Sequence, residues 1–135
     1  MELDEKLKAM ELVTQHLVQP ADLNYHNNLF GGQLLSWMDA GIAMFVMSKI
    51  RYTNIVTVSM DDVSFKAPGK PGDILQIYGK IIKTGRSSVT ARTIAITNNP
   101  QTGLRQAVIE SKITYVCLGE DDKPTPYFEL HNLEF

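Results

Sequence analysis

The longest helical pattern in the chain runs from Gly31 or Gly32 to about Ser48. Apolar residues return there every three or four positions and form one broad stripe, which consists of Leu34, Leu35, Met38, Ile42, Phe45 and Val46. Gly41 lies inside this stretch, where a glycine costs about 1 kcal/mol relative to alanine, so we expect a packing reason for it. The pattern predicts one long apolar helix at the centre of the fold.

After Lys49 the apolar positions recur at every second residue, which is the period of a β-strand. In "IVTVSM" the apolar residues alternate with Thr57 and Ser59, and the alternation resumes in the opposite phase after Asp61 and Asp62. This change of phase predicts a bulge or a bend. Three further strands, separated by turn sequences, are predicted at Ile74 to Lys83, Ser87 to Thr97 and Leu104 to Leu118.

The two ends of the chain carry weaker patterns. Leu3, Leu7 and Met10 have helical spacing, whereas Val13 to Val18 fits either a helix or a strand, so we assign a helix only to the first part. The following "QPADLNYHNN" is rich in residues that favour turns and caps, and it predicts a loop that leads into the central helix. The C-terminal "GEDDKPTPYFELHNLEF" predicts a turn and an irregular tail.

The order of these elements indicates an α+β fold in a single domain, residues 1–135, with an antiparallel sheet packed on one long helix. The segment Ser87 to Thr97 carries apolar atoms on both sets of alternate residues, but one helix covers only one face of a sheet. We therefore expect the second face, or an edge of the sheet, to meet another subunit of a homo-oligomer.

Composition narrows the class of protein. A formal net charge of -2 lacks the basic excess of a protein that neutralises many phosphates, which argues against nucleic acid as the main partner. The acidic, amphipathic N-terminus does not have the form of a signal peptide, and no run reaches the roughly 18 apolar residues of a membrane span. We expect a cytoplasmic protein without a membrane partner. The one cysteine, Cys117, lies in a predicted strand, where we expect a buried structural thiol.

Asp39 is the residue that ordinary packing explains least. A carboxylate beside an apolar stripe loses contact with water unless hydrogen bonds or a ligand compensate, although a position at the border of the stripe, facing solvent, would also account for it. The helix on which it lies opens with Phe30, Gly31 and Gly32, where unpaired backbone N–H groups can polarise a carbonyl oxygen. Asn24 in the preceding loop offers either a side-chain donor or a turn-forming cap.

With these residues in view, "PADLNYHNNLFGGQLLSWMD" resembles the signature of hotdog-fold acyl-CoA thioesterases of the YciA/BACH acyl-CoA hydrolase type. In that signature a loop of the form D-x-N-x-x-G-[DN]-x-[FH]-G-G leads into an apolar helix that carries an acidic residue. "VSFKAPGKPGD", "TGRSSVT" and "ITYVCLGEDDKPTP" are similar to further segments of the family. The resemblance spans about residues 13–126 and implies a hotdog fold, in which the sheet wraps around the helix.

The resemblance also implies an activity, the hydrolysis of acyl-CoA to coenzyme A and a carboxylic acid. Asp39 would be the general base or nucleophile, Asn24 its partner at the thioester or the attacking water, and the backbone at Gly31 and Gly32 would polarise the carbonyl. The site would lie between two subunits, with Asn24 of one chain facing Asp39 of the other. Three further residues would lie near the pantetheine or phosphate end of coenzyme A, namely Arg86, Ser87 and Ser88.

No metal or separate cofactor is needed for this reaction, because a thioester is already activated and coenzyme A is part of the substrate. The three histidines lack the spacing of a metal site, and "GQLLS" is not a nucleophile elbow. A dimer would be the minimal active unit, with a tetramer or hexamer also open. Five apolar residues are candidate walls of an acyl tunnel or ordinary core residues, namely Trp37, Met38, Met44, Phe45 and Met60.

Two other functions are considered. The sequence departs from the family at His26-Asn27, where the family often has a glycine at the second position. A hotdog hydratase or dehydratase would pair a histidine with the carboxylate, and His26 is the candidate near the motif. We expect His26 to lie at a pocket rim or in solvent instead. A non-catalytic acyl-CoA-binding module would use Asp39 only as polar lining.

Arg86 could also be a solvated hairpin charge, and weaker candidates for a phosphate contact are Lys66, Lys83 and Arg105.

Overall fold

The computed structural model describes residues 2–127, which form an α+β unit with one five-stranded sheet. The helices are α1 (Glu2–Lys8) and α2 (Gly31–Ile50), with a short 3-10 turn at Pro20–Asp22. The strands are β1 (Glu11–Leu17), β2 (Ile55–Phe65), β3 (Ile74–Thr84), β4 (Ser88–Asn98) and β5 (Arg105–Cys117). The predicted central helix and the three predicted C-terminal strands are confirmed with small shifts at their ends, and the segment left open between helix and strand is β1.

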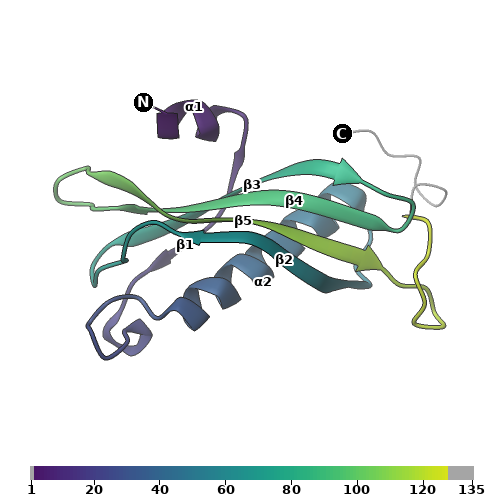
Figure 1. Cartoon of the computed structure of the whole chain (residues 1–135), viewed down its shortest axis with the longest axis horizontal. Helices are drawn as coiled ribbons and strands as arrows, with labels where there is room; N and C mark the ends of the chain where they lie inside the picture. Colours follow the sequence, from purple (N-terminus) through teal and green to yellow (C-terminus); the bar gives the residue numbers. More distant parts are fainter. Residues whose placement is uncertain (1, 128–135) are drawn as a thin grey trace.

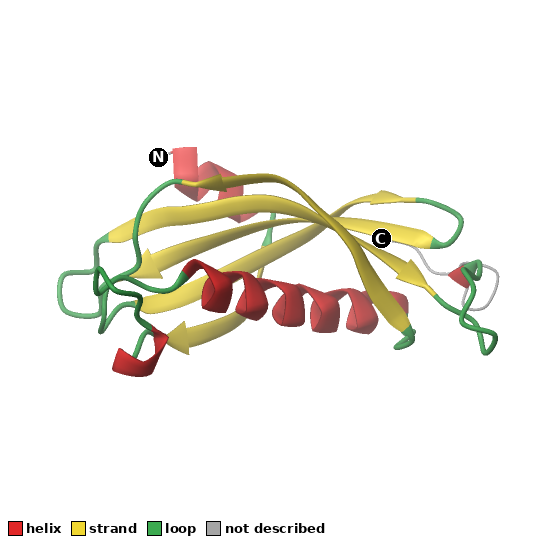
Figure 2. Ribbon diagram, turned by 60° about the horizontal axis from the view of Figure 1, so that its bottom comes forward, coloured by secondary structure: helices red, strands yellow, loops and turns green. Residues whose placement is uncertain are grey.

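The sheet has the strand order β1-β3-β4-β5-β2, and every neighbouring pair is antiparallel. Helix α2 lies along one face of the sheet, and α1 lies on the other (Figure 1). The strands curve over α2 (Figure 2), which is the predicted hotdog arrangement of a sheet around a long helix. β1 and β2 are the two edges of the sheet, so the backbone of β2 is open on the side away from β5.

The main core fills the space between α2 and the sheet. Met38, Ile42 and Val46 of the predicted stripe are completely buried, and Leu34 is 2% exposed. They meet the inward-facing residues of the sheet, which include Leu75, Ile77, Val89, Ala91, Ile109 and Ile113. Burying an aliphatic side chain of this kind contributes about 1.5–3 kcal/mol, so this contact fixes the position of α2 on the sheet.

The opposite face of the sheet has a smaller core. Leu7 of α1 packs on Ile94 and Ile96 of β4 in a second buried cluster. The ion pairs of Lys6 with Glu110 (3.0 Å) and Arg105 with Asp4 (2.8 Å) surround this contact. The apolar residues on the second face of β4, for which a partner subunit was expected, are thus covered at this place by the chain's own N-terminal helix. The expectation of a partner remains for the sheet edge.

Two irregular segments also match their predictions. The pairing of β2 with β5 shifts register between Asp61 and Ser64, and Asp62 has a φ of 54°, which is the predicted bulge. After β5 the chain turns at Gly119, whose N–H donates to the Lys123 carbonyl at 2.8 Å. The predicted irregular tail lies beyond residue 127 and therefore outside the described residues.

Cys117 is fully buried, and burial raises the pKa of its thiol to about 11, as suits a structural residue. Within residues 2–127 no helix has the length and apolar character that crossing a membrane requires.

Gly41 has the packing reason that its place in the helix indicated. A Cβ atom at this position would lie 2.8 Å from Cγ2 of Thr14 in β1, which is closer than side-chain carbons approach one another. We expect Gly41→Ala to lower the free energy of unfolding by about 1 kcal/mol, because the clash outweighs the gain in helix propensity. Urea unfolding measures the difference.

Thr14→Ser provides the matched background for this prediction, because it removes only the clashing methyl group. In that background Gly41→Ala should stabilise the protein, by about 1 kcal/mol at most. An equal stabilisation by Gly41→Ala in both backgrounds would show that Thr14 does not limit the approach of β1 to α2.

Candidate active site

Asp39 lies two turns into α2, on the side of the helix that faces β2 and β5. Its carboxylate oxygen Oδ1 accepts a hydrogen bond from Thr57 Oγ1 at 2.7 Å and from the Tyr115 hydroxyl at 3.2 Å. The same hydroxyl also donates to the main-chain carbonyl of Asp39 at 3.0 Å. Within residues 2–127 nothing hydrogen-bonds to the second oxygen, Oδ2. The side chain is half-buried and held through one oxygen, as a base directed at a ligand would be.

Tyr115 provides this support from inside the core. It is 1% exposed, and burial together with the neighbouring charge of Asp39 raises the pKa of its hydroxyl above the ordinary value. The hydroxyl therefore stays protonated, and remains a donor, at neutral pH. Thr57 lies directly opposite Tyr115 in the antiparallel pairing of β2 with β5, so the register of two strands brings both donors to Asp39.

The loop before α2 is held together by Asn24. Its side-chain oxygen accepts hydrogen bonds from the backbone N–H groups of His26 (2.9 Å) and Asn28 (3.1 Å). This is the cap role that the sequence left open as an alternative. The bonds fix the amide plane through its oxygen, and the Nδ2 group has no hydrogen-bond partner within the described part of the chain. Asn24 can therefore shape the loop and donate to a ligand at the same time.

The start of α2 presents open backbone donors next to Asn24. The first helical hydrogen bond runs from Leu34 N–H to the Phe30 carbonyl at 3.0 Å, so the N–H groups of Gly31, Gly32 and Gln33 precede the helical ladder. Asn24 and Gly31 line one pocket of about 400 Å³, together with Phe65 and Lys66. The Phe65 ring packs on Gly31, at 3.7 Å from the position of a Cβ atom there.

Within a single chain, Asp39 and the loop do not come together. Gly31 and Asp39 are eight residues apart on one helix, and a rise of 1.5 Å per residue separates them by about 12 Å along its axis. The pocket at the start of α2 contains Asn24 and Gly31 and does not include Asp39. The predicted site residues thus lie in two separate places on a single chain, Asn24 and Gly31 in the pocket and Asp39 further along α2.

The predicted coenzyme A contacts lie at the far end of the fold. Arg86, Ser87 and Ser88 form the β3–β4 hairpin, beyond the C-terminal end of α2, whereas the Asn24 loop is at the opposite end (Figure 1). The hairpin is attached to the end of β5 by a hydrogen bond from Cys117 N–H to the Ser87 carbonyl at 2.8 Å. The Arg86 side chain is exposed.

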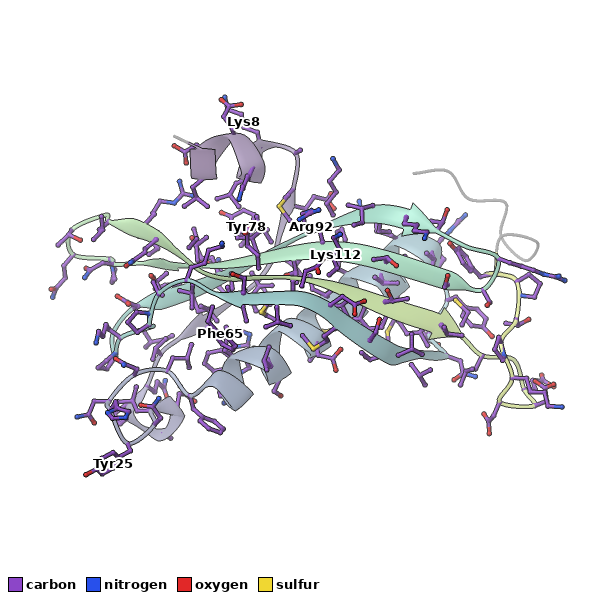
Figure 3. All side chains as sticks on the ribbon, viewed as in Figure 1. Lys8, Tyr25, Phe65, Tyr78, Arg92 and Lys112 are labelled. Carbon is purple, nitrogen blue, oxygen red and sulfur yellow. The ribbon has the colours of Figure 1, made fainter. Side chains whose placement is uncertain are left out.

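His26 is exposed in the loop, and its ring meets the ring of Tyr25, edge to face, at a centroid distance of 5.5 Å. Figure 3 shows Tyr25 pointing away from the rest of the molecule. No histidine hydrogen-bonds to Asp39 within residues 2–127, so the chain by itself does not form the histidine–carboxylate pair of a hydratase.

The weaker cation candidates have separate positions. Lys66 lines the pocket at the start of α2 and pairs with Glu110 at 3.2 Å, and Arg105 pairs with Asp4 of α1. Lys83 is exposed near the end of β3. Lys70, which the sequence did not single out, donates to the Asn28 side chain at 2.6 Å and adds a positive charge beside the Asn24 loop.

The candidate tunnel residues divide between core and surface. Met38 is fully buried in the core, and Trp37 stacks on His16 of β1 with a centroid distance of 4.3 Å and an interplanar angle of 3°. Phe45 and Met60 are half-buried against the core, whereas Met44 is 58% exposed. Packing accounts for most of this set. Within the described residues no group of three or more His, Cys, Asp or Glu side chains is placed to hold a metal ion.

Sequence reasoning missed the residues that support the site. Thr57 and Tyr115 are ordinary strand residues in the pattern, and only the pairing of β2 with β5 reveals that they share a neighbour on α2. Asp22 was interpreted only as a turn former. Its carboxylate accepts hydrogen bonds from Gln19 N–H (2.9 Å) and from the Gln33 side chain (3.1 Å), which ties the loop to the first turn of α2.

Comparison with known proteins agrees with the fold of the chain. The family model described as the thioesterase superfamily matches residues 26–104, which include the α2 start, Asp39 and strands β2 to β4. Acyl-CoA thioester hydrolase YciA of Salmonella typhimurium is 32% identical over 119 residues, which cover 86% of this chain and 89% of that protein.

Two solved structures show the same fold. The hexameric thioesterase y2039 of Yersinia pestis has a TM-score of 0.80 and 35% identity over 86% of this chain and 93% of its own. An acyl-CoA hydrolase of Staphylococcus aureus, solved in complex with butyryl coenzyme A and coenzyme A, has a TM-score of 0.77 and 30% identity. That match covers 84% of this chain and 68% of the Staphylococcus chain.

Proposed function

This chain belongs to the thioesterase superfamily, and on that basis we propose that it hydrolyses acyl-CoA thioesters at a site that two copies of the chain build together. Asp39 is the general base, and Asn24 with the first amides of α2 polarises the thioester carbonyl. The observation that carries the proposal is the half-buried Asp39 carboxylate, which Thr57 and Tyr115 hold through one oxygen while the other is left open.

The reaction follows from these groups. Asp39 Oδ2 takes a proton from a water molecule whose oxygen attacks the thioester carbonyl carbon. Negative charge on the carbonyl oxygen is stabilised by the N–H groups of Gly31 and Gly32 and by Asn24 Nδ2. When the carbon–sulfur bond breaks, the thiolate of coenzyme A receives the proton from Asp39, and a carboxylic acid is left. A thioester needs no further activation, because its leaving group is a stable thiolate.

A second copy of the chain supplies the missing half of each site. The separation of about 12 Å along α2 keeps Asp39 away from Gly31 of its own chain, so we propose that Asn24 and Gly31 of a partner face it. Support comes from β2, an eleven-residue edge strand that is open to pairing. Its exposed apolar side chains are Val56, Val58, Val63 and Phe65. Long exposed edges of this kind are normally covered in native proteins.

The assembly is therefore a homo-oligomer with a dimer as its minimal active unit, and the hexameric state of the Yersinia pestis protein supports it. The hairpin with Arg86, Ser87 and Ser88 is our candidate contact for the phosphate or pantetheine part of the substrate. Arginine suits phosphate because its donors form a planar fork, and the Arg86 side chain is exposed and available.

We predict that Asp39→Asn lowers kcat by about a hundredfold or more, because an amide cannot accept the proton of the attacking water. Thiol release from acyl-CoA substrates measures the rate. Asp122→Asn is the matched control, since Asp122 is an exposed carboxylate in the turn after β5, away from the β2 edge, and should keep full turnover. Full hydrolysis by Asp39→Asn would remove the general base from the proposal. Calorimetric binding of acyl-CoA to the wild type without thiol release would instead indicate a binding module.

For Asn24 we predict that two substitutions separate its loop role from its donor role. Asn24→Asp keeps an oxygen acceptor for the N–H groups of His26 and Asn28 but loses the Nδ2 donor, so the fold should be kept while kcat falls at least tenfold. Asn24→Ala loses both functions and should also lower the melting temperature. Calorimetry and the thiol-release assay give the two readouts. Unchanged turnover in Asn24→Asp would leave Asn24 with the loop role alone.

A further inference from the structure

Tyr115 is a buried tyrosine whose hydroxyl contacts Asp39, a side chain of the proposed active site. The hydroxyl makes two contacts with one residue, at 3.0 Å to the Asp39 carbonyl and 3.2 Å to Oδ1. Thr57 reaches the same Oδ1 from the neighbouring strand at 2.7 Å. The residue is nearly inaccessible to solvent, so it cannot itself touch a substrate.

Both side-chain donors act on the same carboxylate oxygen. A carboxylate on a helix can rotate about its side-chain torsions, which would present either oxygen or move the charge away from the reacting atoms. Two donors that come from two paired strands and converge on Oδ1 restrict this rotation. Oδ2 is then the oxygen that faces away from the sheet support.

We propose that Tyr115 is a positioning residue for the hydrolysis reaction: with Thr57 it fixes the Asp39 carboxylate through Oδ1, so that Oδ2 is the oxygen that accepts the proton of water. This inference rests on the proposed function of Asp39. The groups of the sheet that meet Asp39 are Thr57 from β2 and Tyr115 from β5. On α2 itself the other charged residue is Lys49, ten residues and about 15 Å further along the helix.

The acceptor of both hydrogen bonds is a carboxylate, and a hydrogen bond to an ionised group is stronger than one between neutral groups. The two donors therefore hold the orientation of the carboxylate firmly. The phenol remains a donor throughout, because burial and the charge of Asp39 raise its pKa. Tyr115 thus acts through Asp39, by orienting the base.

A structural clamp is the alternative role, and the fold provides a matched control for it. The hydroxyl of Tyr52, just after the end of α2, donates to the Leu118 carbonyl at the end of β5. It therefore links the same helix to the same strand as Tyr115 does, but without a contact to Asp39. Loss of either hydroxyl should loosen the contact of α2 with β5. Only loss of the Tyr115 hydroxyl should change the orientation of the Asp39 carboxylate, and with it kcat.

The experiment compares wild type, Tyr115→Phe and Tyr52→Phe in thiol-release assays over a range of pH, with melting temperatures measured alongside. For Tyr115→Phe we expect kcat to fall about tenfold over the whole range of pH, with KM nearly unchanged. Tyr52→Phe should lower the melting temperature while its kcat and pH profile match the wild type.

Variants of Thr57 remove the other donor to Asp39 Oδ1 and leave the core intact. They can therefore test the proposal even if Tyr115→Phe does not fold. Thr57→Val removes the second donor to Oδ1 and should lower kcat over the same range of pH, whereas Thr57→Ser keeps a hydroxyl and should restore the wild-type profile. Thr57 is exposed in β2, so neither variant creates a cavity in the core.

The outcomes distinguish a failure of the positioning role of Tyr115 from a failure of the proposed function. An active wild type with unchanged kcat and pH profile in folded Tyr115→Phe overturns the positioning role alone. If Tyr115→Phe does not fold, an unchanged profile in Thr57→Val overturns it. Equal changes of kcat in Tyr115→Phe and Tyr52→Phe would show that Tyr115 is a structural clamp, and would also overturn the positioning role. A wild type that releases no thiol from any acyl-CoA overturns the proposed function, and the role of Tyr115 with it.

Discussion

The rise of a single α-helix determines how this protein must work. Helix α2 carries open backbone donors at its first residues and a carboxylate at Asp39, and the helical rise keeps these groups about 12 Å apart. No rearrangement of side chains closes such a gap within one chain. In the proposed site either half is incomplete alone, and the long open edge of β2 offers a surface on which a second chain can supply the other half.

The remaining structure serves to hold this helix and its carboxylate in place. The buried stripe of α2 fixes the helix on the sheet, and Gly41 allows β1 to approach closely from one side. From the other side the register of β2 with β5 brings Thr57 and Tyr115 to Asp39. A shift of the edge strand β2 by one residue along β5 would turn Thr57 to the other face, so the same strand pairing that stabilises the sheet also orients the proposed base.

Much of the fold could be predicted from the sequence, because periods of 3.6 and two are strong signals in long segments. The apolar stripe of α2 predicted its buried face, and the change of phase at Asp61 and Asp62 predicted a bulge that the structure contains. The position of α1 could not be predicted. A seven-residue helix carries no sign of where it packs, and its contact with Ile94 and Ile96 covers a surface for which another subunit was expected.

The candidate site was predictable only in its loop and helix. Asp39, Asn24 and the glycines were identified because their motif is local in the chain, and the role of Asn24 in the loop was weighed as an alternative. Thr57 and Tyr115 lie 58 residues apart and carry no motif of their own, so only the pairing of strands reveals them. Long-range register is the information that periodicity does not contain.

The central claim, a site shared by two chains, is tested most directly by complementation between two inactive variants. Asn24→Asp and Asp39→Asn chains are mixed in equal amounts, unfolded and refolded together, and assayed for thiol release beside each variant treated alone. If each site takes Asn24 from one chain and Asp39 from the other, every mixed dimer contains one intact site, and roughly a quarter of wild-type activity returns. A mixture no more active than its separate components would contradict the account, because it would place both residues in a site built by one chain.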